Sequence, residues 1–310
     1  MTYYLGIDGG GTKTRCLLGD ETRPLAMATT GGSNIVRLGE TQAREALLTS
    51  IHQVCSTVGI SPDQISAICI GVAGASIPEV AAKIRGILTE LMPQVSLTNI
   101  EVAGDNVIAL EAAFAAGPGV IAIAGTGSLV YGRNAAGHTA RAGGWGFAIS
   151  DEGSGHWIGR HAISAILHAR DEGLETALAA MVLQGWKLAT IDDLVQHANS
   201  TPPPDFPRLF PVVLRAAEEG DAIARELLAD AGAKLANLAT AVVRRLTPHA
   251  SREIGPMDLL PVAMTGSVFR QSADVRQVFY NTLQTNFPGI DVHQELADPV
   301  EGALARAKRR

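Results

Sequence analysis

The segment with the clearest chemical character lies at residues 6–14, which read GIDGGGTKT. Three successive glycines let the backbone approach a ligand closely, and their consecutive N–H groups can form a concave nest for an anion. The hydroxyls of Thr12 and Thr14 can donate hydrogen bonds to phosphate oxygens. A carboxylate beside a bound phosphate is repelled unless a cation lies between them, so Asp8 predicts Mg²⁺, held through water. The spacing excludes a P-loop, which needs lysine directly after its second glycine. A plain hairpin turn is the alternative.

A second turn of the same kind lies at residues 125–128, which read GTGS. An apolar run precedes it and another follows, as around residues 6–14. Alone, such a turn predicts phosphate binding only weakly, and chance similarity of glycine turns is the alternative. Taken with the first, it predicts two related lobes whose turns hold a triphosphate.

A third candidate is Asp105, which follows a short predicted strand at residues 99–103 and precedes a helical pattern at residues 106–116. Aspartate is a common N-cap, and that is the structural alternative. In phosphoryl transfer to a hydroxyl, a carboxylate in such a place is the general base that accepts the hydroxyl proton.

Three further loops carry groups that suit a sugar, which needs amide and carboxylate partners for its hydroxyls and an apolar surface for its C–H face. They contain Asn34 in GGSN, Trp145 in GGWG and Asp151 in DEGSG. The alternatives are a turn for Asn34, a core anchor for Trp145 and a helix cap for the segment that starts at Asp151.

The elements that must position these residues are strands alternating with helices. Apolar runs at 3–8 and 14–19 predict a hairpin, and the pattern after it predicts a largely parallel sheet covered by helices. The expected helices are 42–58, 78–91, 106–116, 154–170, 174–183, 191–198, 221–245 and 299–307; the expected strands after the hairpin are 65–72, 99–103, 120–124, 129–131 and 259–265. The proline-rich segment 200–207 predicts a loop.

The bulk composition bounds the class of protein. Hydrophobic residues make up 46% and charged residues 18% of the 310 residues, which is typical of a globular core. A net charge of −6 argues against nucleic acid or an anionic membrane as partner. The three cysteines form no metal-binding or disulfide pattern. Without a long apolar run or a leader pattern, we expect a soluble cytoplasmic protein.

With its motifs in this order, the chain resembles the sugar kinase/heat-shock/actin superfamily, and within it the N-acetylglucosamine kinase branch grouped with the BadF/BadG-type ATPases. The motifs are the first phosphate segment 6–14, the first connecting segment 104–106, the second phosphate segment 125–128, the adenosine segment 263–267 and the second connecting segment 299–303. The resemblance implies an α/β, two-lobed actin/hexokinase-like (ribonuclease H-like) fold with duplicated β-sheet cores flanked by helices and an interlobe cleft. Its N-terminal lobe would be 1–116, completed by 297–310, and its C-terminal lobe 117–296, with the dimerisation surface.

The resemblance also implies a function: ATP- and Mg²⁺-dependent phosphorylation of the C6 hydroxyl of an amino sugar, N-acetylglucosamine first. Glucosamine or glucose is the alternative acceptor, and an ATPase switch without a sugar substrate is a more distant one. Asp105 would be the catalytic base, Asp8 would lie near the metal, and a homodimer is expected. The residues expected to bind ATP are Gly10, Gly11, Thr12, Lys13, Thr14, Thr126, Gly127, Gly266 and Ser267. Those expected to bind the sugar are Asn34, Asp105, Thr126, Gly144, Trp145 and Asp151. The chain lacks the cysteine-rich zinc motif of the repressor/open-reading-frame/kinase family and the clustered iron–sulfur cysteines of the reductase-activating ATPases.

Overall fold

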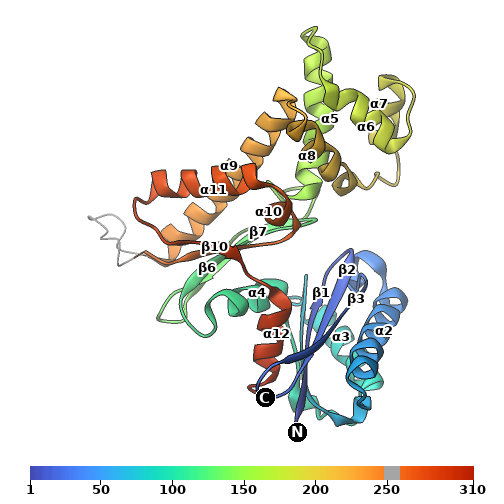
Figure 1. Cartoon of the computed structure of the whole chain (residues 1–310), viewed down its shortest axis with the longest axis vertical. Helices are drawn as coiled ribbons and strands as arrows, with labels where there is room; N and C mark the ends of the chain where they lie inside the picture. Colours follow the sequence, from blue (N-terminus) through green and yellow to red (C-terminus); the bar gives the residue numbers. More distant parts are fainter. Residues whose placement is uncertain (248–258) are drawn as a thin grey trace. The chain divides into compact units, whose positions relative to one another are not determined.

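The computed structural model describes residues 1–247 and 259–310, which divide into two compact units (Figure 1). Unit 1 consists of Met1–Ile121 and Ala297–Arg310, and unit 2 of Ala122–Leu296. Each unit has a five-stranded sheet flanked by helices, which is the two-lobed actin-like class that the sequence predicts. In this part of the chain no helix combines the length and the hydropathy needed to cross a membrane.

The sheet of unit 1 has the strand order β3-β2-β1-β4-β5. Strands β1 to β3 are an antiparallel meander, whereas β1, β4 and β5 run parallel. The sheet is therefore mixed: the predicted hairpin of β1 and β2 is confirmed, and β4 and β5 after it are parallel to β1 as expected. The unpredicted β3 adds a third antiparallel strand, since a short turn joins it to β2. The strands are β1 (Tyr3–Gly9), β2 (Lys13–Gly19), β3 (Pro24–Gly31), β4 (Ile65–Val72) and β5 (Ile100–Gly104).

Helices cover both faces of this sheet. Leu5 and Ile7 pack with α2 and α3 in one cluster, and Leu17 packs with α12 on the opposite face. A Cβ atom at Gly6 would lie only 2.2 Å from the Leu304 N atom, so the glycine lets α12 lie directly on β1. Figure 1 shows this C-terminal helix (red) against the N-terminal sheet (blue). The helices of unit 1 are α1 (Ile35–Leu38), α2 (Glu40–Val58), α3 (Pro78–Leu91), α4 (Asp105–Phe114) and α12 (Pro299–Ala307), with 3-10 turns η1 (Pro62–Gln64) and η2 (Leu97–Asn99).

The sheet of unit 2 has the order β10-β9-β6-β7-β8. The long helix α9 packs on β7 and β8 and on its other sides contacts α5, α8 and α11. The strands are β6 (Gly119–Ala124), β7 (Ser128–Arg133), β8 (Thr139–Gly143), β9 (Val262–Thr265) and β10 (Val292–Leu296). The helices are α5 (Gly155–Asp171), α6 (Ala177–Trp186), α7 (Ile191–Ala198), η3 (Phe206–Leu209), α8 (Phe210–Glu218), α9 (Ala222–Leu246), α10 (Ser267–Gln271) and α11 (Ala273–Asn286).

The expected elements are confirmed to within a few residues, and η3 corrects the end of the predicted proline-rich loop. Three strands, β3, β8 and β10, were not predicted, and each lies at the edge of its sheet. Their sequences, PLAMATTG, TARAG and VHQEL, are rich in small and polar residues. Edge strands commonly carry such residues because one side of the strand faces no neighbour, so they lack the apolar pattern of a central strand.

Candidate active site

The glycine-rich turn between β1 and β2 packs against the loop that follows β3. The Gly10 carbonyl accepts hydrogen bonds from the N–H groups of Ser33, at 3.1 Å, and Asn34, at 3.3 Å. A Cβ atom at Gly9 would lie 2.7 Å from Ser33 Oγ, and one at Gly32 would lie 2.7 Å from the Gly11 carbonyl oxygen. Glycine is thus required here by the close approach of two loops, whether or not a ligand is bound.

The polar residues of this turn separate into an exposed and a buried set. Thr12 and Lys13 are exposed at the tip of the turn. Thr14 is fully buried and donates its hydroxyl to Ser33 Oγ at 2.8 Å, so its hydroxyl is directed into the protein. Asn34 is half-buried and caps α1, since its Oδ1 accepts from the Arg37 N–H at 3.3 Å. The structure thus gives Thr14 and Asn34 local structural contacts that the sequence did not reveal.

Asp8 and Asp105 both lie at the carboxyl edge of the parallel strands. Asp8 is in register with Gly71 of β4, which is in register with Ala103 of β5, so one strand separates the two carboxylates. Two strand spacings correspond to about 10 Å between the backbones. This edge is where ligands bind in open α/β sheets.

Asp105 is the first residue of α4, and Gly104 is its N-cap, so the reading of Asp105 as an N-cap is wrong. The Asp105 side chain accepts a hydrogen bond from the backbone N–H of Asn106 at 2.9 Å. The carboxylate therefore stays at the start of the helix, where the positive end of the helix dipole stabilises negative charge.

The electrostatics of Asp8 suit a bound cation. Burial, followed by the negative charge of Asp105, raises the pKa of Asp8 to about 6, against the opposing effect of Arg15. A nearby cation would stabilise the ionised carboxylate that these surroundings disfavour. In the described part of the chain, no cluster of three metal-ligating side chains exists. A Mg²⁺ ion held by one or two carboxylates, water and substrate phosphates fits this donor set.

In unit 2, the turn between β6 and β7 is fixed to the first residues of α5. The Gly125 carbonyl accepts from the Gly155 N–H at 2.8 Å, and the Thr126 carbonyl accepts from the His156 N–H at 3.1 Å. Within the turn, the Gly125 N–H donates to the Gly127 carbonyl at 2.9 Å. These bonds satisfy helix N–H groups that would otherwise have no partner.

Asp151 lies directly on this turn. A Cβ atom at Gly127 would be 2.9 Å from Asp151 Oδ2, and the Asp151 side chain is 8% exposed. Its backbone has a φ of +70°, a left-handed conformation that few residues other than glycine adopt. Burial raises the pKa of Asp151, and a hydrogen bond from the backbone N–H of Ser128 partly opposes this effect. Such a strained, buried carboxylate is typical of a functional position.

The loop that carries Gly144 and Trp145 is held by Arg141. The Arg141 guanidinium donates to the carbonyls of Gly143, at 3.1 Å, and Gly144, at 2.8 Å, and lies 4.4 Å from the centre of the Trp145 ring. Trp145 itself is 66% exposed, which makes its reading as a core anchor wrong. An exposed indole held in place by a cation presents an apolar face at little conformational cost.

The predicted adenosine segment, residues 263–267, lies beside the turn between β6 and β7. Gly266 has a φ of +106°, and a Cβ atom there would be 2.2 Å from the Ala124 carbonyl oxygen at the end of β6. The Ser267 hydroxyl lies 4.0 Å from the Cβ position of Gly125. The residues predicted in unit 2 are therefore brought together at one end of its sheet: Thr126, Gly127, Gly144, Trp145, Asp151, Gly266 and Ser267.

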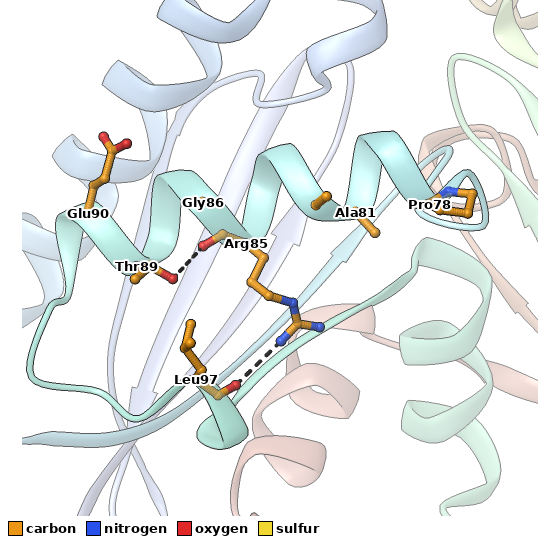
Figure 2. Close-up of a pocket in the computed structure, with 8 residues that line it drawn as sticks. Pro78, Ala81, Arg85, Gly86, Thr89, Glu90 and Leu97 are labelled. Carbon is orange, nitrogen blue, oxygen red and sulfur yellow. Dashed lines mark hydrogen bonds between the residues drawn. The ribbon is translucent and has the colours of Figure 1, made fainter.

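Sequence reasoning missed several residues that hold the site. Three of them contact residues that the sequence did predict: Ser33 contacts Thr14, Ser128 contacts Asp151, and Arg141 contacts Gly144 and Trp145. The sequence signal that could have identified them is their position inside or beside the glycine motifs. Arg15 and Asp298 pair across 283 residues of sequence, and no local pattern indicates that contact. A hollow of about 590 Å³ along α3, lined by Arg85, Gly86 and Leu97 among others, contains none of the predicted site residues (Figure 2).

Comparisons with known proteins agree along the whole chain. A model of the BadF/BadG/BcrA/BcrD ATPase family matches residues 5–305. The N-acetylmuramic acid/N-acetylglucosamine kinase of Clostridium acetobutylicum is 32% identical over 312 residues, which cover 99% of each chain. The glucosamine kinase GspK of Vibrio cholerae is 32% identical over 241 residues, which cover 76% of this chain and 78% of that one. A solved structure from Chromobacterium violaceum, provisionally assigned as an N-acetylglucosamine kinase, has a TM-score of 0.77 at 29% identity, with 99% of each chain covered.

Proposed function

This chain belongs to the BadF/BadG/BcrA/BcrD ATPase family, and from that premise we propose that it is an ATP-dependent kinase of an amino sugar. The γ-phosphoryl group of ATP is transferred to the C6 hydroxyl, with N-acetylglucosamine as the first choice of acceptor. The names of its full-length relatives support the class of acceptor. The observation that carries the proposal is the position of Asp105, a carboxylate at the start of α4 that one intervening strand, β4, separates from Asp8.

In this proposal each unit has its own part. In unit 1, Asp105 accepts the proton of the attacking hydroxyl, and the N–H groups of residues 9–12 bind phosphate oxygens. Bound Mg²⁺, near Asp8, neutralises charge on the phosphates. In unit 2, Thr126 and Gly127 bind phosphate, while Gly266 and Ser267 lie against the adenosine. Lys13, exposed beside the first turn, adds positive charge.

The proposed sugar contacts follow from the chemistry of three side chains, of Trp145, Asp151 and Asn34. Trp145 offers its ring to the C–H face of the sugar, and Asp151 accepts hydrogen bonds from hydroxyls. Asn34, whose oxygen caps α1, keeps its side-chain NH₂ group for a donor role. Thr14 acts by fixing Ser33 rather than by touching phosphate.

Glucosamine is the second candidate acceptor, because the relative from Vibrio cholerae is named for it. The two acceptors differ only in the acetyl group, which removes a positive charge from the sugar nitrogen. A homodimer in the cytoplasm stays a prediction, and sedimentation of the purified protein measures the oligomeric state.

The deciding experiment measures ADP release from ATP and Mg²⁺ with a panel of sugars. The panel contains N-acetylglucosamine, glucosamine, glucose, N-acetylmannosamine and N-acetylgalactosamine, with a reaction without sugar as the control. We expect the highest kcat/KM for N-acetylglucosamine and a 6-phosphate product by NMR. ADP release that does not depend on any sugar would overturn the proposal in favour of an ATPase switch.

A further inference from the structure

An ion pair between the two ends of the sequence lies beside Asp8. Arg15 on β2 and Asp298 form a bidentate pair in which Nη1 contacts Oδ1 and Nη2 lies 2.9 Å from Oδ2. The side chains are 15% and 27% exposed, so both charges are largely withdrawn from water. Asp298 is the N-cap of α12, yet its carboxylate makes no capping hydrogen bond. Its carboxylate oxygens therefore accept hydrogen bonds from Arg15 and not from the N–H groups of the helix.

Arg15 has a second carboxylate within reach, that of Asp8. The two residues are directly opposite in the antiparallel pair of β1 and β2, so their side chains lie on the same face of the sheet. That face also carries Leu17, which packs on Val300 and Leu304 of α12. Both members of the ion pair act on Asp8, since the charge of Arg15 lowers its pKa and the charge of Asp298 raises it.

The Arg15 guanidinium can pair with either of two carboxylates, and its bond to Asp298 decides between them. A guanidinium that loses its partner in a half-buried position is strongly disfavoured unless it finds another anion. The carboxylate opposite Arg15 is that of Asp8, the group that we place beside the metal. A direct Arg15–Asp8 pair would satisfy the guanidinium and compete with a cation for the same oxygens.

We propose that Asp298 is a positioning residue for nucleotide binding, which holds the Arg15 guanidinium away from Asp8 and so keeps the Asp8 carboxylate available to a divalent cation. The inference rests on the proposed function only through the use of a metal–nucleotide complex. It assigns a role to the residue at which the C-terminal helix begins, and it makes the start of α12 part of the nucleotide site.

The test compares four variants by the affinity for ADP, measured by titration calorimetry with excess Mg²⁺ and with EDTA. They are Asp298→Asn, Arg15→Gln, the double variant Arg15→Gln/Asp298→Asn, and Glu101→Gln. The last is the matched control, because Glu101 pairs with Arg306 of the same helix, Nε to Oε1 at 2.9 Å. Arg306 is eight residues beyond Asp298, about 12 Å along the helix axis. Melting temperatures report any general loss of stability.

The measured quantity is the factor by which Mg²⁺ strengthens ADP binding. We expect Asp298→Asn to lower this factor at least about fivefold, the small end of typical couplings between sites. The double variant should recover it to within about twofold, because no guanidinium remains to compete. Glu101→Gln should lower the melting temperature and leave the factor unchanged.

Two results would overturn the inference while leaving the proposed function intact: a factor in Asp298→Asn equal to that in Glu101→Gln, or no recovery in the double variant. Loss of the factor in all variants, the control included, would also overturn it, since that result reflects general destabilisation. If the unmodified protein binds ADP without any Mg²⁺ dependence, the inference and the proposed metal–nucleotide chemistry both fail.

Discussion

The two glycine–threonine turns have the same layout but different supports. The turn of unit 1 is packed on the loop of Gly32 and Ser33, and Cβ atoms at its Gly9 and Gly10 would come closer than 3.0 Å to neighbouring atoms. The turn of unit 2 is attached through two carbonyls to the first N–H groups of α5, and Gly125 has space around its Cβ position. The first turn is tightly packed at Gly9 and Gly10, whereas the second has space at Gly125 and is tightly packed only at Gly127, against Asp151.

The charges around the turns differ as well. Asp8 shares its surroundings with Asp105, Asp298, Lys13 and Arg15. Asp151, on the second turn, is raised in pKa mainly by burial, with weaker effects from Glu152 and Arg141. The difference teaches that a repeated backbone turn can have different neighbours: the first turn lies near several charged side chains, and the second lies against one buried carboxylate.

The largest expected effect is on kcat and comes from Asp105, since the second turn has no carboxylate in a corresponding place. Asp105→Asn removes the proton acceptor while keeping the shape of the side chain and its hydrogen bond to Asn106. We expect kcat to fall at least about a hundredfold with little change in sugar affinity. Steady-state kinetics measure both, and Asp63→Asn, an exposed aspartate of the same unit, is the matched control. Full activity in Asp105→Asn would remove the base from its assigned place.

A pair of glycine variants tests the difference in packing. Gly10→Ala places a methyl group 2.9 Å from the Lys13 carbonyl oxygen and should lower the free energy of unfolding by about 1–3 kcal/mol. Gly125→Ala meets nothing nearer than 4.0 Å and should change it by less than about 0.5 kcal/mol. Denaturant unfolding measures both values.

The same pair separates stability from ligand binding. If phosphate lies on the second turn, Gly125→Ala should raise the KM for ATP about tenfold, roughly the loss of one hydrogen bond to a charged group. A stable Gly125→Ala protein with normal KM would show that phosphate does not approach this turn.

Much of this arrangement could be predicted from the sequence. We could place Asp8 and Asp105 at strand ends from the glycine runs, the strand–helix alternation and the order of the motifs. This was possible because the local backbone conformation depends mainly on nearby residues. The central strands were also predicted, since each contains a run of apolar residues. The edge strands β3, β8 and β10 were not, because alanine, glycine and polar side chains suit a loop as well as an edge.

The contacts that sequence could not give are those between distant residues. Ser33 and Thr14 are 19 residues apart, and Arg15 and Asp298 are 283 apart. Nothing near either residue requires the other, and only the folded register of β1, β2 and α12 brings them together. Trp145 is a related case: a large aromatic residue is usually buried, and the clamp by Arg141 that keeps it exposed becomes evident only from the loop geometry.

The exposed indole gives a prediction of intermediate size. Trp145→Ala should raise the KM for the sugar about tenfold, as expected when the loss of an aromatic contact costs about 1–2 kcal/mol of binding free energy. Stability should fall by less than about 1 kcal/mol, because the ring is exposed and its main partner is one cation. Phe147→Ala, a neighbouring exposed aromatic residue, is the control in kinetics and thermal unfolding. Equal KM values for the two variants would argue against a specific role for the indole.

The smallest effect concerns Asp151 and the pH dependence of stability. Its pKa is raised in the folded state above the ordinary value of 3.8, so the ionised carboxylate destabilises the fold at neutral pH. That destabilisation is complete above the folded-state pKa and fades as the pH falls towards 3.8. Asp151→Asn keeps the acceptor for the Ser128 N–H and suits the left-handed backbone, which asparagine tolerates. The variant should therefore melt at a higher temperature than the unmodified protein at pH 8, with the difference shrinking as the pH falls from the folded-state pKa towards 3.8, while its sugar KM rises. A melting difference that stays constant with pH, or one of opposite sign, would show that the folded structure does not disfavour the ionised Asp151 carboxylate.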